Sequence, residues 1–396
     1  MTVVPQIRPA PARRKIAILG STGSVGRQTI DLIARAPDAY ETVALTANKN
    51  VGALAEQARL LHAQMAVVAD ESQYQALKDA LAGTPTKVAA GAQAVVEAAE
   101  ADSDWIMSAI VGAAGLPATL AAAERGATIA FANKETLVCA GPLMMKLVAE
   151  RGATLLPVDS EHNAIYQVFD FDHKDGIARL ILTASGGPFL SLSREEMAKV
   201  TPEQAVKHPV WNMGAKISVD SATLMNKALE VIEAAFLFQM PREQIDVLVH
   251  PQSVIHSMVE YRDGSVLAQL GSPDMRTPIG FCLAWPRRME TPVPKLDLAK
   301  IGQLTFQAPD PQKFPALAFA QEALRKGGTA PAILSAANEV AVQAFLDKRI
   351  GFLDIERINE AVLTALPTAA LTDLDVLREA DAAARAKAEE MITSRQ

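Results

Sequence analysis

The chain has 396 residues, 49% hydrophobic and 21% charged, which is the balance of a folded globular protein long enough for two or three domains. Its 38 Lys and Arg against 45 Asp and Glu give a net charge of -7, which excludes a broad basic surface for nucleic acid; an anionic ligand needs a local pocket. Two cysteines, Cys139 and Cys282, exclude a disulfide framework and fit core positions in a cytoplasmic, reducing compartment.

Two segments test whether the chain is targeted to a membrane. Residues 1–14 carry proline and arginine without the apolar core of a secretory signal, and we expect a flexible tail there. Residues 105–123 carry no charge, but Gly112, Gly115 and Pro117 interrupt them. A buried strand, a turn and a helix explain this run better than a membrane span.

A glycine-rich turn follows the first expected strand. The strand covers 15–19, GSTGSVG covers 20–26, and a helix is expected over 27–35. Glycines at such a turn allow a pyrophosphate to approach the helix N-terminus, where N–H groups and the helix dipole favour anions. The candidate cofactor contacts in this turn are Thr22, Gly23, Ser24 and Val25.

The end of the next strand indicates which dinucleotide binds. The strand over 41–45 runs into Thr46-Ala47-Asn48-Lys49-Asn50, where an NAD enzyme places an acid on the ribose. No acid is present, and Lys49 is suited to a 2'-phosphate, so the segment favours NADP, with Asn48 and Asn50 beside it. The alternative is that Lys49 is a solvated loop lysine.

Further short apolar runs alternate with helical segments. They lie at 65–68, 105–111 and 128–131, which is typical of a doubly wound parallel sheet. The glycine-containing loop 111–115 is placed to contact the cofactor. At the end of the strand over 128–132 we expect three polar groups at the ligand-binding edge, Asn133, Lys134 and Glu135, with Lys134 on the substrate or nicotinamide side.

The strand over 154–158 runs directly into Asp159-Ser160-Glu161. In an extended backbone, carboxylates at i and i+2 project to the same side and repel unless a cation or proton lies between them. We therefore expect Asp159 and Glu161 to share a cation. The alternative is a solvated loop with a helix beginning at Ser160.

Two later segments suit an anionic substrate. The Ser-Gly-Gly turn that begins at Ser185 exposes N–H groups and a hydroxyl, as phosphate sites and ordinary tight turns both do. The aperiodic segment 207–214 is expected to form a loop whose Trp211 and Met213 close over a ligand. The alternative is that Trp211 anchors this loop in a core.

A capped helix is expected over 218–230. Asn226, Lys227 and Glu230 are three or four residues apart and share one side of it, close to Ser221 at its start. We interpret them as an anion pocket beside a third metal carboxylate, although most Lys–Glu pairs of this spacing are surface pairs.

The remaining chain predicts a hairpin and a helical bundle. The turn 262–265 joins strands before and after it into a hairpin that backs the site or forms an oligomer interface. His250 and His256 precede that turn and are left out of the metal site, because a lone histidine is more often structural. Proline-rich residues 286–315 indicate an extended connection. The alanine-rich sequence from residue 316 onward indicates a small helical bundle.

Eight segments, in chain order, resemble one family, the 1-deoxy-D-xylulose 5-phosphate reductoisomerases. They are GSTGSVG at 20–26, ANKE at 132–135, PVDSEHNAI at 157–165, SGGPF at 185–189, KISVDSATLMNKALE at 216–230, HPQSVIHSMV at 250–259, GSPDMRTPI at 271–279 and AANE at 336–339. The resemblance implies NADPH-dependent conversion of 1-deoxy-D-xylulose 5-phosphate to 2-C-methyl-D-erythritol 4-phosphate for isoprenoid synthesis. It also implies a homodimer.

The resemblance implies roles for individual residues. A divalent cation, Mg2+, Mn2+ or Co2+, would be bound by Asp159, Glu161 and Glu230. The remaining implied contacts are Ser185, Ser221, Asn226 and Lys227 to the substrate phosphate, Ser160 and Lys134 to other substrate oxygens, His208, Trp211 and Met213 in the closing loop, and Gly214 with Asn133 and Glu135 at the cofactor. Lys134, Glu161 and Glu230 are the candidate catalytic residues.

Together these features predict an α/β protein in several parts. We expect a tail over 1–14, a Rossmann-like NADPH-binding domain over 15–158, an α+β catalytic and dimerisation domain over 159–285, a proline-rich linker over 286–315 and a helical bundle over 316–396. Two other functions are compatible with the first domain: another NADP-dependent dehydrogenase of a phosphorylated substrate, and a non-catalytic NADP sensor. The dehydrogenase would not need three carboxylates beside a phosphate pocket, and the sensor would bind the cofactor without consuming NADPH with any sugar phosphate.

Overall fold

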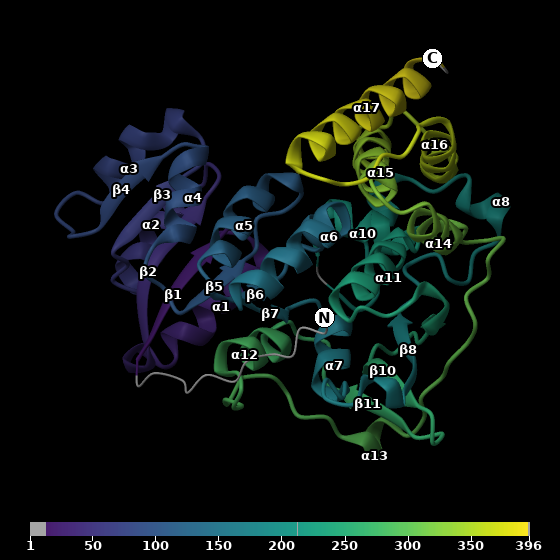
Figure 1. Ribbon diagram of the computed structural model, residues 1–396, viewed down its shortest axis with the longest axis horizontal. Helices are drawn as coiled ribbons and strands as arrows, with labels where there is room; N and C mark the ends of the chain where they lie inside the picture. The colour runs from purple at the N-terminus through teal and green to yellow at the C-terminus, as the bar shows by residue number, and fades with distance from the viewer. Residues whose placement is uncertain (1–12, 212, 395–396) are drawn as a thin grey trace. The chain divides into compact units, whose positions relative to one another are not determined.

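Seven parallel strands form the larger sheet of the computed structural model, which describes residues 13–211 and 213–394 (Figure 1). Their order is β4-β3-β2-β1-β5-β6-β7. The strands are β1 Arg14–Leu19, β2 Tyr40–Ala47, β3 Met65–Val68, β4 Lys87–Ala90, β5 Trp105–Ser108, β6 Thr128–Phe131 and β7 Thr154–Pro157. Successive connections reverse direction between β1 and β5, which is where such sheets bind ligands.

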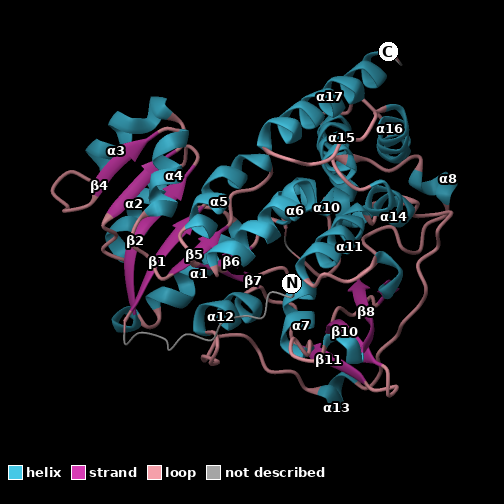
Figure 2. Ribbon diagram, viewed as in Figure 1, coloured by secondary structure: helices cyan, strands magenta, loops and turns pink. Residues whose placement is uncertain are grey.

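Helices cover both faces of this sheet (Figure 2). They are α1 Ser24–Ala34, α2 Val51–Leu60, α3 Tyr74–Ala80, α4 Ala92–Glu100, α5 Leu116–Glu124 and α12 Arg276–Ala284. The helices α6 Lys134–Arg151 and α7 Ser160–Val168 follow β6 and β7 in the chain. Helix α2 packs on α3, α4 on α5, and α1 on α12. The central strands are mainly apolar, as parallel strands covered on both faces require, and Ile16, Ile18 and Trp105 are fully buried. The predicted doubly wound sheet is confirmed.

The uncharged run 105–123 forms β5, a short 3-10 helix and α5, as expected. Within residues 13–211 and 213–394, no helix is both long and apolar enough to cross a membrane. The short 3-10 helices are η1 Pro37–Ala39, η2 Glu71–Gln73, η3 Ala113–Gly115, η4 Lys174–Gly176 and η5 Arg242–Gln244.

A second, four-stranded sheet is mixed, in the order β11-β10-β8-β9. Its strands are β8 Ile177–Ala184, β9 Ile245–Val249, β10 Ile255–Tyr261 and β11 Val266–Leu270. Strands β10 and β11 are antiparallel, so the predicted hairpin is confirmed. The helices of this region are α8 Arg194–Met197, α9 Pro202–Ala205, α10 Ala215–Ala222, α11 Met225–Leu237 and α13 Leu298–Ile301, and α11 packs on β8 and β9.

The C-terminal part is helical, as predicted. Its helices are α14 Ala316–Lys326, α15 Ala330–Leu346, α16 Phe352–Ala365 and α17 Leu374–Thr393. Buried Ile333, Phe345 and Ile358 lie in one core with Val219 of α10. Helix α10, which carries Ser221, is therefore packed against the C-terminal helices.

The chain divides into two compact units. The first comprises the chain up to Thr136 with Met144–Tyr166 and Asp274–Pro294, and the second comprises Leu137–Leu143, Gln167–Pro273 and Lys295 onward. Most of the expected flexible tail, residues 1–12, lies outside the described residues, while Arg14 begins β1.

The single helix expected over 218–230 is wrong. The backbone breaks at Leu224, whose φ of 58° is left-handed, and this break ends α10 and begins α11. The Leu224 side chain is only 2% exposed. Burial of this side chain offsets the unfavourable backbone conformation, and helical periodicity alone does not reveal such a break.

Candidate active site

The glycine-rich turn has the geometry that its sequence predicts. Gly20 has a φ of 86°, and a Cβ on it would lie 2.7 Å from the Ala109 carbonyl oxygen. A Cβ on Gly26 would lie 2.3 Å from the Gly20 oxygen. Gly23 begins α1 without a side-chain cap, which leaves the first turn of the helix to an anionic ligand.

Two side chains that the sequence did not reveal hold this turn in place. The Ser21 hydroxyl lies 2.7 Å from Oε1 of Gln57, whose Nε2 donates back to the Ser21 carbonyl at 3.1 Å. The Thr46 hydroxyl accepts a hydrogen bond from the Gly20 N–H at 3.0 Å. The turn is thereby tied both to α2 and to the end of β2.

The proposed 2'-phosphate residues lie at the start of α2. Asn48, Lys49 and Asn50 are exposed, and Asn50 caps the helix by accepting the Ala53 N–H at 3.2 Å. Lys49 thus stands immediately before a helix N-terminus. Both the ammonium group and the helix dipole favour an anion at this position.

The buried Asn133 side chain makes a structural hydrogen bond. Its Nδ2 donates to the Gly112 carbonyl at 2.9 Å, and a Cβ on Gly115 would lie 2.4 Å from that nitrogen. The side chain therefore fixes the loop after β5 against the start of α6. Lys134 and Glu135 follow it and are also buried.

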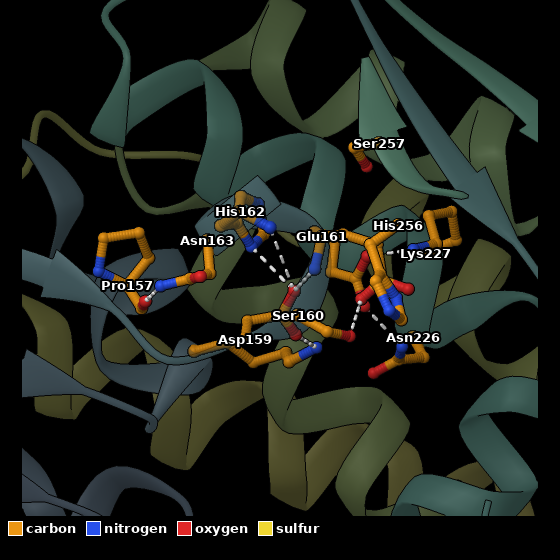
Figure 3. Close-up of polar contacts among 12 residues, drawn as sticks. Pro157, Asp159, Ser160, Glu161, His162, Asn163, Asn226, Lys227, His256 and Ser257 are labelled. Carbon is orange, nitrogen blue, oxygen red and sulfur yellow. Dashed lines mark hydrogen bonds and ion pairs between the residues drawn. The ribbon is translucent and has the colours of Figure 1, made fainter. Parts of the chain in front are cut away.

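Asp159 precedes α7 and caps its first turn, which corrects the extended arrangement expected for this pair of acids: the helix begins at Ser160, as in the alternative interpretation. Its Oδ1 accepts the N–H groups of Glu161 at 3.1 Å and His162 at 3.3 Å, so Glu161 lies in the first helical turn and not on a strand. Lys134 Nζ lies 2.7 Å from Asp159 Oδ2. His162 Nδ1 lies 3.1 Å from Asp159 Oδ1 (Figure 3). We did not predict from the sequence that His162 contacts Asp159, although the D-x-x-H spacing at a helix start indicates such a contact.

The three predicted metal ligands do come together. One carboxylate oxygen from each of Asp159, Glu161 and Glu230 lies within 4.8 Å of the others. An all-oxygen set of three carboxylates suits a hard cation such as Mg2+ or Mn2+. Ser160 donates to Glu161 Oε2 at 2.8 Å, so its hydroxyl belongs to the same cluster.

Glu230 is fully buried on α11 and is held by two neighbours on its own helix. Asn226 Nδ2 lies 2.5 Å from Glu230 Oε1, and Lys227 forms an ion pair with Oε2. The predicted common face of these residues is confirmed. Because Lys227 is itself 3% exposed, this is a buried pair and not the surface pair of the alternative interpretation.

The Ser-Gly-Gly turn is joined to the loop after α9. His208 Nδ1 accepts the N–H groups of Val210 at 3.1 Å and Trp211 at 2.9 Å, so the ring proton lies on Nε2 and is donated to Ser185 Oγ at 2.9 Å. Ser185 Oγ also accepts the Gly187 N–H at 3.2 Å. Its own proton therefore remains for a ligand. Burial lowers the pKa of His208 and favours this neutral ring.

The same turn packs against the end of α10. Gly187 has a φ of 68°, and a Cβ there would lie 2.6 Å from the Ser221 carbonyl oxygen. The turn that begins at Ser185 and the end of α10 that carries Ser221 therefore lie in close backbone contact.

The predicted closing loop is only partly described, because residue 212 lies outside the described residues. Trp211 is half-buried, with its ring 6.2 Å from the His256 ring. Met213 is half-buried and exposed Gly214 begins α10. His250 is structural, as expected: Nε2 accepts the N–H groups of Val254 and Ile255.

Family models for one enzyme match most of the chain. The model described as 1-deoxy-D-xylulose 5-phosphate reductoisomerase matches residues 16–141, and two models of its C-terminal domains match 155–238 and 270–387. The reductoisomerase of Rhodospirillum centenum is 64% identical over 381 residues, which cover 96% of this chain and 95% of that protein. The chain belongs to this family. The protein is an NADP-dependent oxidoreductase, and the sequence resemblance predicted both its fold and its activity correctly.

Solved structures of the family agree. The Zymomonas mobilis enzyme in complex with NADPH has a TM-score of 0.92 and 56% identity, covering 96% of this chain and 99% of that chain. A family structure in complex with NADPH, fosmidomycin and magnesium has a TM-score of 0.92 and 43% identity, with 96% and 98% covered.

Proposed function

We propose that this chain converts 1-deoxy-D-xylulose 5-phosphate to 2-C-methyl-D-erythritol 4-phosphate through the residues described above. The observation that carries the assignment is the convergence of Asp159, Glu161 and Glu230. These carboxylates would hold a divalent cation, which supplies Lewis acidity to adjacent ketone and hydroxyl oxygens of the substrate. NADPH supplies the hydride for the reduction.

The remaining polar groups orient the substrate. Ser185 offers a hydroxyl proton because its oxygen already accepts from His208. With Ser221, Asn226 and Lys227 it would bind the phosphate, and this remote grip would hold the reacting end in place. Ser160 and Lys134 would hydrogen-bond to the other substrate oxygens.

The loop residues and the nucleotide contacts complete the proposal. His208, Trp211 and Met213 would exclude water when the loop closes. NADPH would be bound by the turn residues Thr22 to Val25, by Asn48, Lys49 and Asn50, and by the segment Asn133 to Glu135 with Gly214. The tight Gly20 and Gly26 contacts and the α2 N-terminus support the first two groups.

The assembly and setting are also proposed. Strand β11 is at the edge of its sheet, with Val266 46% and Leu267 48% exposed, which supports a homodimer formed at this edge. Cys139 and Cys282 are both buried and are not joined in a disulfide, which supports a reducing, cytoplasmic setting. The five-part division predicted from the sequence, from the tail through the linker to the helical bundle, remains our proposal for the domains.

One experiment tests the catalytic proposal. NADPH oxidation is followed with 1-deoxy-D-xylulose 5-phosphate, with Mg2+ or Mn2+ and after chelation. We expect turnover only with the metal, while NADPH binding persists in the chelated protein. Full activity after chelation would instead support a dehydrogenase that needs no cation.

A further inference from the structure

A chain of buried polar side chains runs from the C-terminal helices to α10. Asn359 of α16 donates through Nδ2 to Asn338 Oδ1 at 3.0 Å, and Asn338 of α15 donates to Asp220 Oδ1 at 2.7 Å. Asp220 Oδ2 pairs with Lys216 at 2.8 Å. Both asparagines are fully buried, and Asp220 is 1% exposed.

The Asp220 carboxylate sets the donor-to-acceptor direction of these hydrogen bonds. An ionised Asp220 only accepts hydrogen bonds, so Asn338 must present its NH2 group to it and its oxygen to the next residue. Asn359 must then present its own NH2 group. Its Oδ1 accepts no hydrogen bond within the described part of the chain. Each side chain in the series therefore donates toward Asp220, which is the final acceptor.

Apolar packing already holds α10 on α15. Val219 and Ala222 share a core with Ile333 and Ala337. Such packing is not directional, whereas each hydrogen bond in the chain has a fixed length and angle. The hydrogen-bonded side chains thus fix the rotation of α10 and its position along α15, which the apolar core alone does not fix.

Asp220 directly precedes Ser221, whose carbonyl packs against Gly187 of the Ser-Gly-Gly turn. A small shift of α10 therefore changes the separation of Ser221 from Ser185. It also moves Leu224 and with it the start of α11, which carries Asn226.

We propose that Asn338 and Asn359 are positioning residues for the substrate phosphate: they hold Asp220, and through it α10, so that Ser221 and Ser185 face the same anion. This rests on the proposed function of Ser185 and Ser221. It assigns a positioning role to the AANE segment at 336–339, which contributes no residue to the proposed catalytic or binding site.

The test compares two substrates in steady state, 1-deoxy-D-xylulose 5-phosphate and unphosphorylated 1-deoxy-D-xylulose. In Asn338→Leu we expect the KM for the phosphorylated substrate to rise roughly tenfold, the scale of one displaced charge-assisted hydrogen bond, with kcat changed much less. The kcat/KM for the unphosphorylated sugar and the KM for NADPH should stay as in the wild type. Ile333→Val, which trims the same core without touching the polar chain, should leave the KM for both substrates unchanged.

A swapped pair provides the rescue. In Asp220→Asn with Asn338→Asp, the carboxylate at 338 still accepts from Asn359 and now also accepts from the amide at 220. The 338–220 hydrogen bond is thus restored with its direction reversed, and much of the phosphate-specific loss should be recovered. If Asn338→Leu fails to fold, Asn359→Leu and the swapped pair decide the matter. Equal losses with both substrates, or no recovery in the swap, would overturn the proposal.

Ser221→Ala separates this inference from the pocket itself. A raised KM for the phosphorylated substrate in Ser221→Ala but not in Asn338→Leu would reject the positioning role alone. No change in Ser221→Ala would reject the phosphate pocket on which it rests.

Discussion

His208 donates from Nε2 to the Ser185 hydroxyl at 2.9 Å while its Nδ1 accepts two backbone N–H groups. Protonation of Nδ1 would remove the acceptor for Val210 and Trp211 together. The neutral ring is therefore part of how the loop is joined to the Ser-Gly-Gly turn.

The first prediction concerns acid pH. Burial lowers the pKa of His208 below its ordinary 6.5, so the unfolded chain binds this proton more readily than the folded one. Its contribution to stability is present above about pH 6.5 and is lost as the pH falls through that value toward the folded pKa. We expect the KM for the phosphorylated substrate to rise over the same window. Since substrate phosphate also titrates near pH 6, His208→Gln serves as the control. An unchanged acid limb in His208→Gln would assign it to the substrate alone.

The second prediction concerns the buried metal ligand. Glu230→Gln removes a carboxylate that faces Lys227 and Asn226. Turnover should fall on the order of 10²–10³-fold, as when a group that stabilises transition-state charge is lost, while the affinity for NADPH measured by fluorescence titration stays the same. Unchanged turnover at saturating Mg2+ would remove Glu230 from the metal site.

The third prediction concerns cofactor choice. Lys49→Ala should raise the KM for NADPH roughly tenfold by removing a charge-assisted contact to the 2'-phosphate, with little effect on NADH. Lys87→Ala, at an exposed lysine in β4, is the matched control. Equal effects on both nucleotides would mean that Lys49 is a solvated loop residue.

The fourth prediction uses two glycines with opposite surroundings. A methyl group on Gly26 would lie 2.3 Å from the Gly20 oxygen, whereas one on Gly52 in α2 meets nothing within 4 Å. Gly26→Ala should lower the free energy of unfolding by about 1–3 kcal/mol through overpacking and raise the KM for NADPH. Gly52→Ala should be neutral or stabilising by up to about 1 kcal/mol. Thermal melts and NADPH titrations check both; equal behaviour of the two variants would show that the turn tolerates a side chain.

Local sequence predicted those parts of the fold that depend on near neighbours. The glycine-rich turn, the parallel strands and the hairpin follow from spacing, composition and turn residues within a few positions. Asn226, Lys227 and Glu230 were placed together because one helical turn joins them. Glu230 was interpreted as a third metal carboxylate from its helical neighbours, but its assignment to one cation with Asp159 and Glu161 came from the family resemblance, because no local rule brings it to a motif about seventy residues earlier.

The features that the sequence did not reveal depend on distant contacts or on competing local forces. The extended pairing of Asp159 with Glu161 failed because the N–H groups at the start of α7 compete for the Asp159 carboxylate. Asn338 lies 118 residues from Asp220, and nothing near it indicates a buried carboxylate. Gln57 likewise contacts Ser21 only after β2 and α2 have folded.

The break between α10 and α11 has a mechanical consequence. A glycine at position 224 would adopt the same backbone freely and would also let the two helices swing about it. Leu224 is instead locked by its buried side chain, so the corner is rigid. Ser221 on α10 and Asn226 on α11 therefore keep a fixed relative position. We expect the loop that carries His208 and Trp211, and not this corner, to adapt to a bound substrate.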